Sequence, residues 1–336
     1  MPNRLDFLDC AKGISITLVV IFHATMALQK HDLADGHYWL LNNFMSPIRM
    51  PVFFFISGFL LRRTAKDPNH DAFLRKVVNV AYLFALWSIL HLAWRTLSPL
   101  AQAPAPERWI LFLVSPSSVL WFIWALAIYF CVARAGRVLP QKAIFGAALI
   151  LSLSTYLGVF SFDNYAHANV LTYLPFFLFG AWYSEPLVNS RLLRHPLAFP
   201  LSLTVFAVGF VLLYKGSFPM VLESASGFLL AMLGVVVGLS TAIFLCGFGM
   251  ICAVPVFLGR NTLGIYVAHS PIVATLAAGA AAAGPQAMVM QLGVPLVAVA
   301  AILLSLGLKL LLEKAGFRWL YKFPFALTPG PAKTLP

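Results

Sequence analysis

The chain has 336 residues, of which 61% are apolar and only 10% are charged, and its formal net charge is +12. Soluble domains carry about 25% charged residues, so this composition excludes an ordinary soluble protein and predicts an all-α integral membrane protein. A basic chain can bind nucleic acid when its lysines and arginines share a soluble face. Here they lie in short connections between apolar runs, so we expect the lipid bilayer as partner and no nucleic acid.

Apolar runs of about 20 residues predict membrane-spanning helices, whereas the strands of a barrel would show alternating segments of about ten. The first run has Asp6 and Asp9 ahead of it and His23 within it, which is atypical of a cleaved signal peptide, so we expect it to be retained. Residues 1–322 are then expected to form a single transmembrane domain, and 323–336 a short cytoplasmic tail. We expect a bundle of about ten transmembrane helices, at residues 13–30, 45–61, 77–95, 117–134, 142–160, 169–184, 197–214, 227–248, 262–282 and 288–312.

Lysines and arginines concentrate in every second connection between these spans. The opposite side holds only a few, which are Lys30, Arg95, Arg108 and Lys215. Because cytoplasmic loops carry such an excess of positive charge, the pattern places both termini in the cytoplasm. The outer connections at 97–116 and 162–169 are the ones long enough to help shape a binding mouth.

The four cysteines all fall at the cytoplasmic ends of predicted spans, at Cys10, Cys131, Cys246 and Cys252. Thiols stay reduced in the cytoplasm, so no disulfide is expected. The spacing of Cys246 and Cys252 does not fit a zinc pair, and the sequence around them supplies no companion ligands. We therefore expect small buried apolar residues here and no metal site.

The stretch from Lys12 to His23 is the strongest candidate for chemistry. It corresponds to about three helical turns, so the two side chains leave the same face about 16 Å apart. An ionisable side chain inside a span is costly and is therefore a functional candidate. His23 could activate a hydroxyl as a general base, and Lys12 could bind a phosphate at the cytoplasmic mouth. The alternatives are a histidine that hydrogen-bonds a neighbouring helix and a lysine that anchors the span.

Further polar residues lie inside later spans. Arg49 stands between Pro47 and Pro51, which we expect to interrupt the start of the second span and to leave the guanidinium facing a cavity. Such an arginine could recognise the acceptor or the acyl group of a transfer reaction. His269 follows Tyr266 by one helical turn, and either a structural hydrogen bond or a direct role would suit it.

The connection after the second span concentrates cations, among them Arg62, Arg63, Arg75 and Lys76. Two interpretations stay open, a site for anionic lipid and a site for a polyanionic cofactor head group. The chain has no HExxH motif, no GxSxG motif and no carboxylate pair within a span. These absences argue against a metalloprotease, a serine hydrolase and a two-carboxylate glycosidase.

Five segments follow one another in an informative order. The first is LDCAKGISITLVVIFH, which places a basic residue, then ten residues, then His23. The others are RMPVFFFISGFLLRR from Arg49, SSVLWFIWALAIYF from Ser117, LTYLPFFLFGAW from Leu171 and LGRNTLGIYVAHSP from Leu258. Each alone is ordinary membrane sequence, but together and in this order they resemble the membrane-bound acyltransferase family 3, and most of all its fucose O-acetylase-like branch.

The resemblance implies a ten-helix domain in a bacterial cytoplasmic (inner) membrane. Such a domain takes an acyl group, here expected to be acetyl, from cytoplasmic acyl-CoA and delivers it to a hydroxyl of a glycan or lipid-linked sugar on the far side. In this interpretation His23 is catalytic, and it either deprotonates the acceptor hydroxyl directly or transiently carries the acyl group. The donor would be bound by Lys12, Arg62, Arg63, Arg75 and Lys76. The candidates for binding the acceptor or the oxyanion are Arg49, Trp121, Tyr266 and His269.

The chain departs from the family pattern in two positions. Family members often carry an Arg-x-x-Arg pair at the start of the third span, whereas here Asn79 stands in place of the second arginine. Arg49 stands where many members of the branch carry histidine, so the acceptor specificity is expected to differ. No esterase-like domain is appended, so the chain either completes the transfer alone or as a homo-oligomer, or passes the acyl group to a partner protein.

Two other classes of protein remain open. A transporter or flippase would line its path with buried histidine and arginine, although no internal repeat of transporter halves is evident. It would move a substrate across proteoliposomes unmodified and without acyl-CoA. A non-catalytic membrane partner in a polysaccharide assembly complex would tolerate the replacement of His23.

Overall fold

The computed structural model describes residues 6–98, 114–116, 118–160, 162–216, 219–284 and 287–324, and this part of the chain contains helices and turns but no strand. The first helices are α1 (Asp6–Gln29), α2 (Gly36–Lys66), α3 (His70–Leu97), α5 (Trp121–Ala135), α6 (Gln141–Tyr156) and α7 (Tyr165–Trp182). The later helices are α8 (Ser184–Val188), α9 (Ala198–Lys215), α10 (Met220–Cys246), α11 (Met250–Arg260), α12 (Thr262–Ala282), α13 (Ala287–Lys314) and the 3-10 turn η2 (Arg318–Leu320).

Every predicted span coincides with one of these helices. By length and composition, seven helices of the described residues could cross a membrane, namely α1, α2, α3, α9, α10, α12 and α13. Helices α5 and α11 are shorter but apolar. The predicted all-α integral membrane bundle is therefore confirmed, whereas the cytoplasmic location of the termini stays a prediction.

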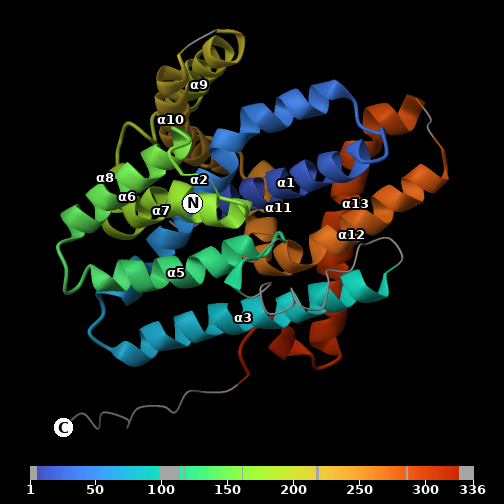
Figure 1. The fold of residues 1–336 in the computed structure, drawn as a ribbon, viewed down its shortest axis with the longest axis horizontal. Helices are drawn as coiled ribbons and strands as arrows, with labels where there is room; N and C mark the ends of the chain where they lie inside the picture. Colours follow the sequence, from blue (N-terminus) through green and yellow to red (C-terminus); the bar gives the residue numbers. More distant parts are fainter. Residues whose placement is uncertain are drawn as a thin grey trace.

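Helix α1 lies near the middle of the bundle, where it contacts α2, α10, α11, α12 and α13 (Figure 1). Helices α2 and α7 pack along one another, and α3 runs beside α5. One face of α1 is buried along its length, from Leu8 through Ile16 and Val20 to Leu28. The helix that carries His23 is thus fixed by packing on several sides.

Glycines make the closest helix crossings possible. A Cβ atom on Gly58 would lie 2.0 Å from the carbonyl oxygen of Phe177, and one on Gly180 would lie 2.1 Å from that of Phe55. These two glycines let α2 and α7 approach backbone to backbone. Small residues commonly permit such approaches between membrane helices, where packing rather than the hydrophobic effect drives association.

The N-terminal end of α1 and the C-terminal end of α13 lie at the same end of the bundle. Arg260, where α11 ends, pairs with Asp6 and Asp9 of α1. The next residue, Asn261, accepts a hydrogen bond from Lys309 of α13 at 2.8 Å. This arrangement agrees with an even number of crossings between the two termini.

Two expectations about α2 need correction. The helix begins at Gly36, well before the predicted span, and continues through Pro47 and Pro51, so these prolines do not interrupt its start. The neighbouring helix explains why they are tolerated. A Cβ atom on Gly234 of α10 would lie 2.2 Å from the carbonyl oxygen of Pro47, so the backbone of α10 directly covers this turn. Proline is tolerated in membrane helices where neighbouring helices compensate for the freed backbone groups.

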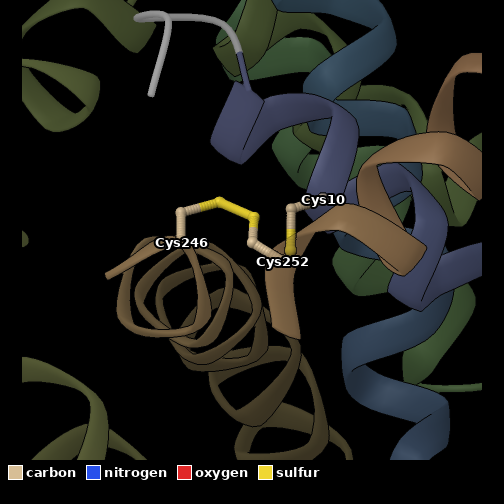
Figure 2. Close-up of side chains that lie close together, drawn as sticks. All are labelled: Cys10, Cys246 and Cys252. Carbon is tan, nitrogen blue, oxygen red and sulfur yellow. A yellow bond between two sulfur atoms is a disulfide. The ribbon is translucent and has the colours of Figure 1, made fainter. Parts of the chain in front are cut away.

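The expectation of no disulfide is wrong, because Cys246 and Cys252 are bonded to one another in the structure. Residues 247–249 turn the chain between α10 and α11, with Gly249 at a φ of 42°, and bring the two Cα atoms to 4.8 Å. That separation lies within the usual range for a disulfide. The buried thiol of Cys10 lies beside the bond, with the three sulfur atoms within 4.8 Å of one another (Figure 2). Three thiolates could ligate a soft metal only after reduction of this bond.

We predict that the disulfide survives denaturation without reductant. Under those conditions a maleimide should modify Cys10 and Cys131, which are the free cysteines, and should leave Cys246 and Cys252 joined. Peptide mass spectrometry of the digested protein measures this directly. The exposed Cys131 serves as the internal control for labelling. Alkylation of both Cys246 and Cys252 in a sample that was never reduced would contradict the prediction.

Candidate active site

A cavity of about 530 Å³ gathers four of the predicted site residues. His23 comes from α1, Arg49 from α2, Trp121 from the start of α5 and Tyr266 from α12. Each stands on a different helix, so only the packing of the bundle brings them together. The remaining lining residues are Val19, Phe22, Met26, Ala27, Lys30, Met50, Val119, Tyr165, Asn169, Tyr173, Ser270, Val273 and Ala274.

His269 lies directly behind His23, and their ring centroids are 5.1 Å apart. The ring of His269 is fully buried, and its Nδ1 donates to the carbonyl oxygen of Tyr266 at 2.7 Å. A nitrogen that donates carries the proton, so Nε2 of His269 is an acceptor. This Nε2 has no hydrogen-bond partner among the described residues. The ring of His23 is adjacent, and an N–H of that ring could donate to this nitrogen.

Arg49 is the buried cation of the site. Its side chain is 7% exposed, and its guanidinium carbon lies 4.2 Å from the centroid of the Phe22 ring. Within the part of the chain that the structure describes, Nη1 of Arg49 has no hydrogen-bond partner. A cation–π contact offsets only part of the cost of burying a charge. Arg49 therefore has hydrogen-bonding capacity available for a bound molecule.

Aromatic side chains form much of the cavity wall. Trp121 and Tyr173 are stacked with their ring centroids 5.9 Å apart, and Tyr173 also stacks on Phe54. The ring of Tyr266 faces His269, but its hydroxyl donates to the carbonyl oxygen of Val119. In this arrangement the proton of Tyr266 is not directed at the cavity, so the predicted oxyanion role of Tyr266 would require its hydroxyl to change partners.

The outer connection at 162–169 contributes to the cavity as expected. Asn164 caps α7 by accepting from the backbone of Ala166, and its amide donates to Ser115 at 2.6 Å. Tyr165 and Asn169, on the first turns of α7, line the cavity. The other expected mouth, 97–116, lies largely outside the described residues, as does Arg108.

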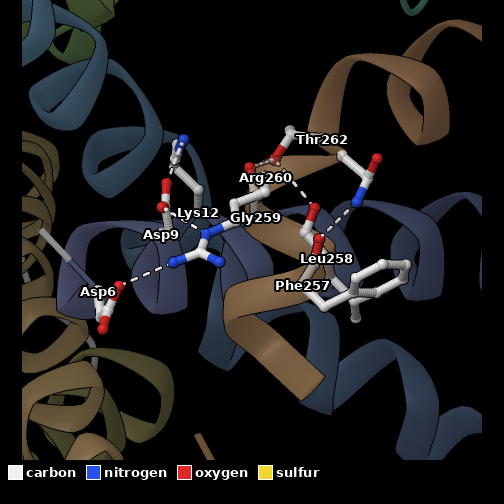
Figure 3. A network of polar contacts seen from close by, with 9 residues as sticks. Asp6, Asp9, Lys12, Phe257, Leu258, Gly259, Arg260 and Thr262 are labelled. Atoms are coloured by element: carbon white, nitrogen blue, oxygen red, sulfur yellow. Dashed lines mark hydrogen bonds and ion pairs between the residues drawn. The ribbon is translucent and has the colours of Figure 1, made fainter. Parts of the chain in front are cut away.

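Lys12 lies away from this cavity, in a charged network at the N-terminal end of α1 (Figure 3). Its ammonium pairs with Asp9 at 2.7 Å, and Asp9 also pairs with Arg260 at 3.3 Å. Arg260 reaches Asp6 at 2.9 Å. The expected phosphate contact of Lys12 would therefore have to compete with Asp9.

The cations of the α2–α3 connection also lie outside the cavity lining. Arg62 stacks on Phe59 and pairs with Glu185 at 3.6 Å, so a carboxylate holds it. Arg63, Arg75 and Lys76 are exposed. These side chains are accessible to a polyanion, and their predicted role in donor binding stays a prediction.

Asn79 has a defined structural role. Its side-chain oxygen accepts a hydrogen bond from the backbone N–H of Phe323 at 2.9 Å. On the same helix, the indole of Trp87 donates to the carbonyl oxygen of Leu320 at 2.7 Å. Where the family often has a second arginine, this chain thus uses an amide to hold the segment after α13 against α3.

The predicted site residues did not include five polar residues of the cavity, which are Lys30, Tyr165, Asn169, Tyr173 and Ser270. The segment that contains Tyr173 was recognised, but a tyrosine among phenylalanines resembles ordinary packing. Lys30 was assigned only to the outer side of the membrane. The available signal was position on α1, because Lys30 follows His23 by about two turns and so returns to the same face.

The bundle encloses a cavity lined by His23 of α1, a helix that contacts five others, and comparison with known families identifies the class of protein. The chain belongs to the family described as an acyltransferase domain, whose model matches residues 5–314. The resemblance noted in the sequence is therefore confirmed, and the chain is a multi-pass membrane protein of an acyltransferase family.

Among curated proteins, the chain is 29% identical over 236 residues to the inner membrane protein YcfT of Escherichia coli strain K12. The match covers 62% of this chain and 65% of that protein, so the chain spans less than two thirds of its relative. No solved structure matches.

Proposed function

We propose that this protein is an O-acyltransferase of the bacterial inner membrane, with residues 1–322 as its transmembrane domain and 323–336 as a cytoplasmic tail. It moves an acyl group, most simply acetyl, from cytoplasmic acyl-CoA to a hydroxyl of a glycan or lipid-linked sugar on the far side. Membership of the acyltransferase family and the name of the inner membrane relative support this proposal.

The observation that carries the proposal is the juxtaposition of His23 with two buried polar atoms. Nε2 of His269 and Nη1 of Arg49 both lack partners among the described residues. Unpaired buried polar atoms occur also on residues that do not line the cavity, which are Ser88, Arg134 and Tyr321. It is therefore the position beside His23 that singles out the atoms of His269 and Arg49. A base, a group that can orient it and a cation at one cavity are the parts that acyl transfer to a hydroxyl requires.

The chemistry follows from these positions. One ring nitrogen of His23 takes the proton of the acceptor hydroxyl while the other donates to Nε2 of His269. The hydroxyl oxygen attacks the thioester carbonyl carbon, the new C–O bond forms and the C–S bond breaks. The proton held by His23 passes to the departing CoA thiolate, so the histidine ends as it began. Arg49 and Trp121 are candidates to stabilise the oxyanion.

The donor would enter from the end of the bundle where Lys12 lies. Lys12 and His23 are about 16 Å apart along α1, a distance that an extended pantetheine arm can bridge. The phosphates of CoA would then meet Lys12 and the exposed cations Arg63, Arg75 and Lys76. Exchange of the Lys12–Asp9 pair for a Lys12–phosphate pair would accompany binding.

Acyl transfer and transport are separated by one experiment. Inside-out vesicles that contain the protein receive acetyl-CoA labelled in the acetyl group, and labelled glycan is then measured in the vesicle lumen. His23-dependent label in the glycan supports the proposal. Movement of unmodified substrate across proteoliposomes without acyl-CoA, together with no labelled glycan, would instead indicate a transporter.

We predict that His269→Asn lowers kcat by about 10²-fold with little change in KM, because it removes the group that orients His23 rather than one that binds substrate. The matched control is His91→Asn. His91 is also buried and bonds α12 through the carbonyl oxygen of Val267 at 2.8 Å, but it does not line the cavity. Steady-state kinetics in detergent or nanodiscs measures kcat and KM separately for both variants. Equal effects of the two variants on kcat would show that His269 acts only through stability.

A further inference from the structure

The described lining of the cavity around His23 carries positive but no negative side chains. It includes two cations, Arg49 and Lys30, and no aspartate or glutamate. Lys30 is exposed, whereas Arg49 is almost entirely buried. The cavity therefore presents a positive potential to whatever enters it.

Arg49 has a buried nitrogen that a bound molecule could pair with. The Phe22 ring covers one face of the guanidinium at 4.2 Å, but Nη1 remains without a partner among the described side chains and backbone. Arg134 differs in degree, because its Nη1 donates to the carbonyl oxygens of Ala65 and Asp67 even though its Nη2 also lacks a partner among the described residues. A guanidinium in a cavity is best completed by a planar or tetrahedral oxyanion, which it binds through paired N–H groups.

Lys30 lies beyond His23 in the chain, whereas Arg49 lies near the level of His23, over the ring of Phe22. Lys30 follows His23 by about 10 Å along α1, in the direction away from Lys12. The phosphates of a donor that enters past Lys12 are therefore at the opposite end of the helix. In the same cavity, the stacked rings of Trp121 and Tyr173 provide a flat apolar wall of the kind on which a sugar ring can lie.

We propose that the acceptor is an anionic sugar, with a carboxylate or phosphate near the hydroxyl that becomes acylated. Arg49 binds this oxyanion, and Lys30 attracts it at the mouth. The inference rests on the proposed acyltransferase function and names the class of its acceptor. The shared chemistry is a sugar-borne oxyanion, whether it comes from a uronic acid or from a phosphorylated sugar.

The test compares three acceptors with the protein in nanodiscs and labelled acetyl-CoA. Octyl 6-deoxyglucoside, octyl glucuronide and octyl glucoside 6-phosphate share their other ring hydroxyls and differ at carbon 6, which is a methyl, a carboxylate or a phosphate ester. At least one anionic acceptor is expected to have kcat/KM about tenfold above the neutral one. The better of the two anions identifies the source of the charge.

Variants of Arg49 separate the inference from the proposed function. Arg49→Gln should bring the anionic acceptors down to the level of the neutral one, and Arg49→Lys should retain part of the preference. The matched control is Lys215→Gln, an exposed cation at the end of α9 outside the cavity, which should change nothing. An equal loss toward all three acceptors would assign Arg49 to the acyl oxyanion and overturn the inference, as would a neutral acceptor that is used as well as the charged ones.

Failure of transfer to every acceptor, with wild type and His23→Ala alike, would count against the proposed function instead. In that case the inference is tested by binding. The melting temperature of the protein in nanodiscs is measured with and without each of the same three glycosides. A shift with an anionic glycoside that Arg49→Gln removes supports an anion site. Equal shifts with charged and neutral glycosides, or none with either, overturn it.

Discussion

His23→Ala is expected to lower the rate of acyl transfer by about 10²–10⁴-fold, the usual contribution of a general acid–base group. The cause is the loss of the base that takes the acceptor proton. The bundle should remain folded, because His23 is only partly buried and lines a cavity rather than the packed core. Transfer of labelled acetyl groups to glycan in inside-out vesicles measures the loss.

The control for this variant is His167→Ala. His167 lies on α7, where its ring contacts Trp124 and Phe162, and it is not part of the cavity lining. It should keep full activity. Undiminished transfer by His23→Ala at equal protein levels would refute the mechanism, whereas equal losses in both variants would point to damaged folding.

The sequence predicts the fold well because membrane insertion imposes a simple rule on it. Each span needs a long apolar run, and every predicted run is a helix. Helix α11 was not predicted, because the apolar segment Met250–Arg260 is too short to match the length of a membrane span. Its position beside α1 depends on contacts between distant parts of the chain, and the pairing of Cys246 with Cys252 follows from the turn that leads into it.

The candidate site was partly predictable for a related reason. A histidine or arginine inside a span is costly in lipid, so His23 and Arg49 were conspicuous against their apolar surroundings. A tyrosine such as Tyr173 is not costly to bury in a membrane. Its position in the cavity therefore could not be inferred from the aromatic segment in which it stands. The unpaired Nε2 of His269 can be recognised only from the structure, because it requires knowing that the other ring nitrogen, Nδ1, donates to the backbone of α12.

The second large effect concerns the crossing of α1 and α11. A Cβ atom on Gly13 would lie 1.8 Å from the carbonyl oxygen of Pro255, and one on Gly259 would lie 1.8 Å from that of Asp9. Backbone atoms meet on both sides, so no side chain can rotate away to relieve the overlap. Gly13→Ala is therefore expected to destabilise the protein by about 3 kcal/mol or more, at the upper end of the cost of overpacking.

The same substitution elsewhere should have the opposite sign. Gly307 lies within α13 with open space where a Cβ would stand, so Gly307→Ala should stabilise the helix by up to about 1 kcal/mol through helix propensity alone. Thermal unfolding in detergent compares the two variants, and a Tm of Gly13→Ala equal to that of Gly307→Ala would contradict a tight crossing. Because Asp9 holds both Lys12 and Arg260, displacement of α11 should also loosen the charged network. Gly13→Ala protein that remains folded should then show a changed KM for the acyl donor, which links this crossing to the proposed donor entrance.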